Sequence, residues 1–274
     1  MCKKPQFKEQ NIQTRCLSRQ MLEARELCKS FNGTRAVNRV SFTIEPGEIL
    51  GYLGPNGSGK STTVKMITGL LEPTLGHVYY RGHDITEAPV AYKSHLGYVP
   101  EEPNLYSYLT GFEYLQMVGR LRGLPERVVQ RRSNELLNLF GLGESRFSVM
   151  TAYSKGMRQK VLIAAALLAD PDVLIFDEPL SGLDVTTALV FRRVVQMLAQ
   201  AGKIILYSSH VLDVVEKIST RVIILRKGEV VANDSAGKLR ELMASPSLED
   251  VFSQLVVEED TESIAANIVS AMRN

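Results

Sequence analysis

The sequence predicts an α/β protein with a parallel-sheet core and an inserted helical subdomain. Short apolar strands alternate with helical stretches after residue 172, which is the pattern of β-α-β units. A glycine-rich loop stands between an apolar run and a helix in the first part of the chain. Between about residues 110 and 169 strand signals vanish and apolar residues take helical spacing, which indicates the inserted subdomain.

The N-terminal part is rich in strand signals. One segment alternates apolar and polar residues, a turn at Pro46 and Gly47 follows, and a continuous apolar run comes next. The expected elements are strands over 40–44 and 49–53, a helix over 61–71, and strands over 77–81 and 97–99.

The second half repeats strands and helices in turn. The expected elements are strands over 173–176, 203–208, 221–225 and 230–232 and helices over 186–200 and 211–218. The chain therefore divides into a polar tail (1–20), a main domain (21–234) with a helical subdomain at about 102–169, and a C-terminal helical extension (235–274). In the extension, two short helices are expected around the acidic stretch Glu258–Asp260.

Composition restricts the class of protein. The 274 residues are 45% apolar and 23% charged, as in an ordinary globular protein, and the net charge of +2 does not indicate a nucleic-acid surface. Cys2, Cys16 and Cys28 form neither a CxxC pair nor a zinc pattern, which favours a reducing, cytoplasmic compartment. The first twenty residues lack the apolar stretch of a secretory signal. The longest apolar run, Val161–Ala169, is too short to cross a bilayer.

The glycine-rich loop has the pattern GxxxxGK(S/T), with an apolar strand before it and a helix after it. Glycines let backbone N–H groups wrap phosphates, and the following helix adds its positive dipole end. Lys60 is expected to reach the β- and γ-phosphates of a nucleotide, and the Ser61 hydroxyl to bind Mg²⁺. The predicted nucleotide-binding residues of this loop are Gly54, Pro55, Asn56, Gly57, Ser58, Gly59, Lys60, Ser61 and Thr62.

Two carboxylates, Asp177 and Glu178, end a buried strand. Successive strand residues point to opposite faces, so we expect Asp177 to face the Mg²⁺ shell and Glu178 to face a water near the γ-phosphate. Glu178 is the candidate general base. A solvated acidic strand end is the alternative.

Together with Tyr153–Gln159, which reads YSKGMRQ, these motifs resemble the nucleotide-binding domains of ABC transporters from about residue 22 to 232. The resemblance implies a P-loop ABC-ATPase fold with an N-terminal antiparallel β subdomain, a parallel-sheet core and a helical subdomain. It also implies that Ser154, Lys155 and Gly156 bind the γ-phosphate of ATP held by a second ATPase subunit, in an ATP-dependent head-to-tail dimer. From the residues alone, Ser154 is a helix N-cap, and a plain capped helix is the alternative.

Other positions match the family one at a time. The resemblance implies that Phe31 stacks on adenine, although a core phenylalanine is the alternative. Ser181 and Asp184 resemble the loop that links the two sites of the dimer, or else a helix-start turn capped by Asp184. His210 matches the switch histidine at the γ-phosphate. Glu101 stands where the family usually has a glutamine that senses Mg²⁺, so it is a candidate metal ligand.

Together with YSKGMRQK and the C-terminal segment Ser247–Phe252, the segment after Glu101 is similar to ATPase subunits paired with ABC-2 type permeases, which implies export of a drug, lipid, glycan or ion. Its aromatic residues line either a groove for a helix of a transmembrane permease or a helical core; they are Tyr106, Tyr108, Phe112 and Tyr114, with Leu109. Membrane contact is then expected only through the permease, on the cytoplasmic face.

Two other functions compete with transport. A non-transport ABC ATPase acting on ribosomes or DNA is disfavoured, because such proteins usually carry two cassettes or a long insertion between the motifs. A module that binds ATP without hydrolysing it is disfavoured because Lys60, Asp177, Glu178 and His210 are all present.

Overall fold

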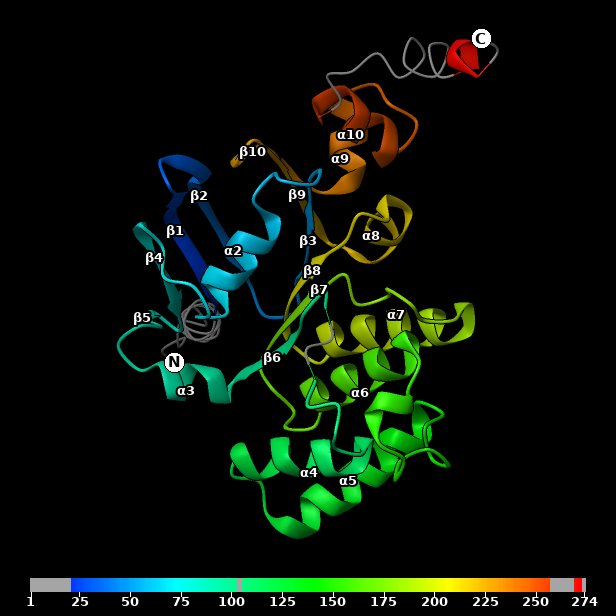
Figure 1. The fold of residues 1–274 in the computed structure, drawn as a ribbon. Coiled ribbons are helices and arrows are strands. Elements are labelled where there is room, and N and C mark those ends of the chain that lie inside the picture. The colour runs from blue at the N-terminus through cyan, green and yellow to red at the C-terminus, as the bar shows by residue number, and fades with distance from the viewer. Residues whose placement is uncertain (1–20, 103–104, 257–268, 273–274) are drawn as a thin grey trace, which may run out of the picture.

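Two β-sheets and a set of helices make up the fold in the computed structural model (Figure 1). The structure describes residues 21–102, 105–256 and 269–272. The predicted polar tail (1–20) and the acidic stretch Glu258–Asp260 lie outside these ranges.

The first sheet is antiparallel, with strand order β2-β1-β4-β5. Its strands are β1 (Leu22–Phe31), β2 (Thr34–Ile44), β4 (Leu75–Tyr80) and β5 (His83–Asp84). The β1–β2 turn places Asn32 and Gly33 at φ 47° and 83°, and two left-handed residues are what a tight hairpin turn requires. The antiparallel N-terminal subdomain is therefore confirmed.

The main sheet has strand order β10-β9-β3-β8-β7-β6, and all its pairs are parallel except β9 with β10. Its strands are β3 (Ile49–Leu53), β6 (Leu96–Val99), β7 (Val173–Asp177), β8 (Ile204–Ser208), β9 (Arg221–Arg226) and β10 (Glu229–Asp234). β3, β7 and β8 are buried along their whole length, which explains their continuous apolar runs. Because the strands are parallel, the loops after β3, β6, β7 and β8 emerge at one edge.

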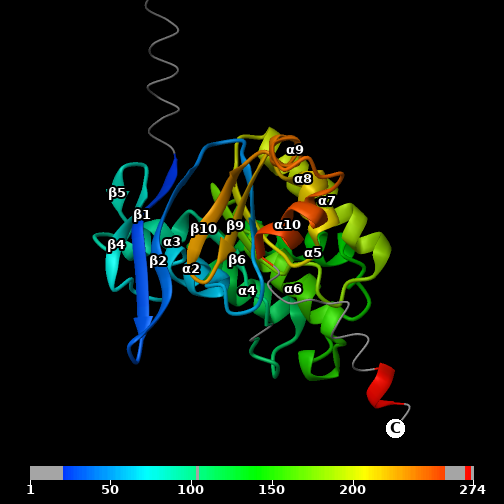
Figure 2. The ribbon, with the colours of Figure 1, turned by 90° about the horizontal axis from the view of Figure 1, so that it is seen from above.

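The main sheet is covered on both faces, as Figure 2 shows from above. The antiparallel sheet and α2 pack on one face, and α6 to α10 pack on the other. The helices of these layers are α2 (Lys60–Ile67), α3 (Pro89–Ser94), α6 (Lys155–Leu167), α7 (Val185–Gln200), α8 (Leu212–Ile218), α9 (Ala236–Leu242) and α10 (Leu248–Val256). No helix in the described ranges is long and apolar enough to cross a membrane.

A third core belongs to the helical part of the chain. α4 (Gly111–Leu121) and α5 (Glu126–Leu139) pack with α6 around a buried apolar cluster of their own. Thr110 and Glu113 form a capping box that begins α4. In Figure 1, α4 and α5 project at one end of the molecule.

The predicted C-terminal end of one helix was wrong. The helix expected over 61–71 ends at Ile67, because Gly69 takes φ 65° and the Leu70 N–H donates to the Lys65 carbonyl, which is a glycine-type helix end. The short helix α3 was not predicted, although Pro89 suits a first helical position.

Three distant segments meet at the Ala36 carbonyl of β2. A Cβ atom added to Gly59 would lie 2.5 Å from that oxygen, and one added to Gly228 would lie 2.8 Å from it. The Asn38 N–H donates to the Gly228 carbonyl over 2.8 Å, and the Gly228 N–H donates to the Ser58 carbonyl over 3.0 Å. β2, the glycine-rich loop and the β9–β10 turn are thus in direct backbone contact.

Candidate active site

The loops at the carboxyl edge of the main sheet enclose a pocket of about 300 Å³. Its lining combines residues predicted from four separate motifs with Ala36 of β2. The lining residues are Phe31, Ala36, Asn56, Gly57, Gly59, Lys60, Ser61, Thr62, Glu101, Asp177 and Glu178. This is the place where open parallel sheets bind ligands.

The glycine-rich loop curves around the N-terminus of α2. Gly57 and Gly59 have φ values of 77° and 100°, a conformation that favours glycine. A Cβ atom on Gly54 would come within 2.7 Å of the Leu225 carbonyl oxygen, so that position has no room for a side chain. Since α2 begins at Lys60, its free N–H groups lie at the pocket, which suits an anion.

Lys60 is the basic group of the pocket. Its Nζ donates to the carbonyl oxygens of Gly54, at 2.6 Å, and Pro55, at 3.1 Å. Burial lowers the pKa of Lys60, and the carboxylates of Glu178, Asp177 and Glu101 act against that shift. The loop therefore holds a cation facing the carboxylates before any ligand is bound.

Asp177 ends β7 and is only 4% exposed. Burial raises its pKa to about 6, with smaller contributions from the charges of Glu101 and Glu178, while Lys60 opposes the rise. A buried carboxylate of this kind has a strong preference for a cation beside it.

Glu178 lies beside Asp177 in the same pocket, and the separate roles expected of the two carboxylates stay predictions. The strand ends at Asp177, and Glu178 takes a left-handed φ of 48°, which breaks the alternation of an extended strand. The Glu178 N–H donates to the Ser208 carbonyl over 2.9 Å, which holds this turn against β8.

His210 contacts Glu178 directly. Its Nδ1 lies 2.8 Å from Glu178 Oε2, and 74% of its side chain is exposed. Ser209, which the sequence reasoning missed, donates a hydrogen bond from Oγ to the same carboxylate oxygen over 3.2 Å. The available signal was a polar residue next to His210 at the end of a strand. Because β8 pairs with β7, the residues after β8 lie beside the carboxylates that end β7.

Three oxygen donors fit a hard divalent cation. The Ser61 hydroxyl and the carboxylates of Asp177 and Glu101 all line the pocket. The described residues hold no cluster of three or more His, Cys, Asp or Glu that could bind a metal unaided. Mg²⁺ takes one or two carboxylates and completes its shell with phosphate oxygens and water, so this donor set suits Mg²⁺ bound together with a nucleotide.

Phe31 stands at the rim of the pocket and is 47% exposed, so it is not a core phenylalanine. Lys29 Nζ lies 5.6 Å from the centre of its ring. An exposed aromatic face at the edge of a phosphate-binding pocket suits a flat base, and the role in stacking on adenine stays a prediction.

The predicted signature residues lie outside this pocket. Ser154 caps α6 and accepts a hydrogen bond from the Met157 N–H over 3.2 Å. Ser154 and Lys155 are exposed, so this helix start faces outward.

The start of α6 packs against the loop that follows Glu178. A Cβ atom on Gly156 would lie 2.3 Å from the Gly182 carbonyl oxygen. Buried Gln159 donates from Nε2 to the Pro179 carbonyl over 3.1 Å. Lys160 Nζ lies 3.2 Å from Asp184 Oδ2.

Asp184 caps α7, accepting the Thr187 N–H over 2.9 Å, while the Ser181 N–H donates to the Glu178 carbonyl. Hydrogen bonds from Thr187 lower the pKa of Asp184, and Lys160 adds to the effect. The sequence alternative, a helix-start turn capped by Asp184, therefore describes the local structure. Any role of Ser181 and Asp184 across a dimer stays a prediction.

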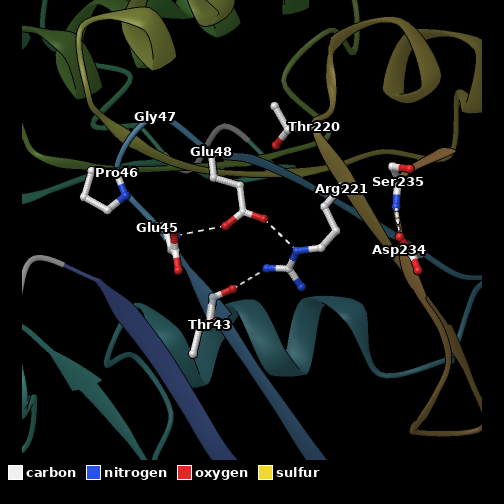
Figure 3. A pocket seen from close by; sticks show the side chains of 9 residues that line it. All are labelled: Thr43, Glu45, Pro46, Gly47, Glu48, Thr220, Arg221, Asp234 and Ser235. Atoms are coloured by element: carbon white, nitrogen blue, oxygen red, sulfur yellow. Dashed lines mark hydrogen bonds and ion pairs between the residues drawn. The ribbon is translucent and has the colours of Figure 1, made fainter. Parts of the chain in front are cut away.

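A larger pocket of about 540 Å³ lies near the opposite ends of β3 and β9 (Figure 3). Arg221 is paired there with Glu48, at 2.6 Å, and with the Asn233 side chain, also at 2.6 Å. The lining contains none of the residues predicted for chemistry. We therefore assign the active site to the pocket at the carboxyl edge.

Comparisons with known sequences identify the family of the chain. A family profile described as ABC transporter matches residues 37–181. The ABC transporter ATP-binding protein NatA of Bacillus subtilis is 40% identical over 224 residues, covering 81% of this chain and 91% of that protein. The daunorubicin/doxorubicin resistance ATP-binding protein DrrA of Streptomyces peucetius is 36% identical, covering 82% of this chain and 68% of that protein.

Solved structures give the same result. The ATP binding subunit of an ABC transporter superimposes with a TM-score of 0.81 and 33% identity, over 86% of this chain and 99% of that one. A dimeric ATP-binding cassette in a post-hydrolysis state, bound to ADP and Pi, has a TM-score of 0.72 and 25% identity, over 78% of this chain and 98% of that one. With the phosphate loop, the paired carboxylates and these relatives in agreement, the chain belongs to the ABC transporter family as an ATP-binding subunit with ATPase activity.

Proposed function

We propose that this chain hydrolyses Mg-ATP at the interface of a head-to-tail dimer, with Glu178 as general base, and thereby drives a separate export permease. The observation that carries the proposal is the convergence of Lys60, Asp177 and Glu178 on one pocket beside a helix N-terminus. That arrangement supplies an anion cradle, a cation site and a base within one enclosure.

Each residue has a distinct role in this proposal. Lys60 and the loop amides hold the β- and γ-phosphates, and Phe31 stacks on the base. Ser61, Asp177 and Glu101 hold the metal and its water ligands. Bound Mg²⁺ neutralises the charge that develops on the phosphates during transfer. Glu178 accepts the proton of the attacking water. His210, which lies 2.8 Å from the Glu178 carboxylate, orients that water.

The dimer is supported by the absence of the signature residues from the lining of the pocket. Ser154, Lys155 and Gly156 form a helix start that does not line the pocket of their own chain, and Ser154 and Lys155 are exposed. In a head-to-tail pair, this helix start meets the γ-phosphate held by the other subunit, where the charge of Lys155 is favourable. The solved cassette with ADP and Pi is itself a dimer.

The permease surface is proposed to follow Glu101. Tyr106 and Tyr108 are 67% and 87% exposed, whereas Leu109, Phe112 and Tyr114 pack on the buried cluster of the helical part. The helical-core alternative therefore describes Leu109, Phe112 and Tyr114, and the permease groove is proposed for the two exposed tyrosines. Exposed tyrosines suit a helix of an ABC-2 type permease, which would hold the chain at the cytoplasmic face of the membrane. DrrA is named for drug resistance, which supports export as the direction.

The test is Glu178→Gln, which keeps the shape of the side chain and removes the base. We expect ATP to bind within a few-fold of the wild-type affinity, and hydrolysis to fall at least about 100-fold, the scale of a general base. The variant should accumulate as an ATP-bound dimer. Phosphate release and solution mass with Mg-ATP measure the two effects.

Glu135→Gln is the matched control, because Glu135 is exposed on α5, away from the pocket. It should hydrolyse ATP as the wild type does. If Glu178→Gln hydrolyses ATP at an undiminished rate, Glu178 is not the base.

A further inference from the structure

Glu178 is held by the chain that leaves β8. Its backbone N–H donates to the Ser208 carbonyl, its Oε2 atom accepts from Ser209 Oγ, and His210 Nδ1 lies 2.8 Å from the same oxygen. Three consecutive residues thus contact Glu178, and two of them do so at one carboxylate oxygen. The structure gives no hydrogen bond to Glu178 Oε1 from the residues it describes, so the two oxygens have different surroundings.

The Ser209 hydroxyl has a defined direction. The Val211 N–H donates to Ser209 Oγ over 3.1 Å and occupies one lone pair. The single hydroxyl proton is then left for Glu178 Oε2, at 3.2 Å. Ser209 is 2% exposed, so bulk water does not compete for this proton. A buried donor with one acceptor is a rigid support.

His210 is a different kind of partner. Its side chain is 74% exposed, so its contact with Glu178 is open to solvent and to an arriving ligand. If His210 turns towards a bound phosphate, Ser209 is the side chain that still holds Oε2. The left-handed backbone of Glu178 adds a reason for such a support, because the strand no longer sets the direction of the side chain.

We propose that Ser209 is a positioning residue for hydrolysis, which holds Glu178 through Oε2 so that Oε1 faces the attacking water. The proposal rests on the assignment of Glu178 as base. It concerns the rate of the chemical step, so removal of the hydroxyl should lower kcat and leave KM nearly unchanged.

The experiment measures ATP hydrolysis by the full chain for Ser209→Ala, in the wild-type background and in Glu178→Gln. We expect kcat to fall about tenfold in the wild-type background, with KM within twofold, since a misplaced base loses part of its general-base contribution. In Glu178→Gln, the same change should alter the residual rate less than twofold, because there is no base left to position.

Two further variants separate positioning from folding. Ser133→Ala deletes a buried hydroxyl on α5, outside the site, and should leave kcat unchanged. Ser209→Thr keeps the hydroxyl. If this variant has the melting temperature of the wild type, it should retain at least half of the wild-type kcat.

Three results would overturn the proposal: kcat within twofold of wild type for Ser209→Ala, an equal loss in both backgrounds, or a normally folded Ser209→Thr as slow as Ser209→Ala. Hydrolysis that survives Glu178→Gln alone would instead refute the assignment of the base. The two failures are therefore distinguishable.

Discussion

At the scale of single residues, the buried Asp177 carboxylate makes the stability of the chain depend on pH. Burial raises its pKa from 3.8 to about 6 in the folded chain. The carboxylate is thus still charged at neutral pH, but burial makes that charge costly unless a cation lies beside it. Asp177 therefore lowers the free energy of unfolding at the position where it is expected to bind the metal.

The resulting prediction concerns Asp177→Asn without Mg²⁺ or nucleotide. The raised pKa means that the stability contribution of Asp177 is complete below about pH 3.8 and is lost as pH rises through about 6. The loss amounts to about 3 kcal/mol at neutral pH. Urea unfolding in EDTA should show Asp177→Asn to be more stable than wild type at pH 7.5 and equal to it near pH 4. A difference that is the same at both pH values would contradict this.

At the scale of elements, the start of α6 and the loop over 179–184 behave as one unit. Gly156 packs on the Gly182 carbonyl, Gln159 bonds the Pro179 carbonyl, and Lys160 pairs with Asp184. The carboxylate that contacts the pocket lies immediately before this loop. The start of α6 is therefore in direct contact with the backbone that follows Glu178.

Gly156→Ala tests this junction. The new methyl group would lie 2.3 Å from the Gly182 carbonyl oxygen, and overpacking costs about 1–3 kcal/mol against a helix-propensity gain of about 1 kcal/mol. We expect a net loss of unfolding free energy on the order of 1 kcal/mol and ATP hydrolysis at least about tenfold slower.

Gly237→Ala on α9 is the matched control, because nothing lies within 4 Å of its new Cβ. It should gain up to about 1 kcal/mol and keep its ATPase rate. Urea unfolding and phosphate release measure both variants. Equal stability gains at the two positions would show that the junction tolerates a side chain.

At the scale of the whole molecule, the proposed dimer assembles each site from two chains. Lys60→Ala and Ser154→Ala should each hydrolyse ATP poorly alone, because both sites of either homodimer carry the defect. A mixture should recover activity, since a mixed pair contains one site with both residues intact. Phosphate release from a 1:1 mixture is the measurement. In a control mixture, the variant that carries both Lys60→Ala and Ser154→Ala takes the place of Lys60→Ala. No mixed pair then contains an intact site, so the activity should not recover.

Much of this architecture could be predicted from the sequence. Strands buried on both faces appear as continuous apolar runs, and parallel strands bring their following loops to one edge, so the meeting of Lys60 with Asp177 follows from motif order. The left-handed turn at Glu178 could not be predicted, because it depends on the neighbouring β8. The support from Ser209 was missed for the same reason. The exposure of Tyr106 and burial of Phe112 likewise depend on the packing of α4 to α6.

The junction at the Ala36 carbonyl has a consequence for how the molecule opens. The hydrogen bonds from Asn38 to Gly228 and from Gly228 to Ser58 both pass through buried Gly228, so displacement of this residue breaks both and leaves its backbone groups unpaired. The first hairpin, the phosphate loop and the β9–β10 turn therefore form one cooperative opening unit. A nucleotide that holds the phosphate loop closed thereby also protects β2 from fraying, including the part of that strand that it does not touch.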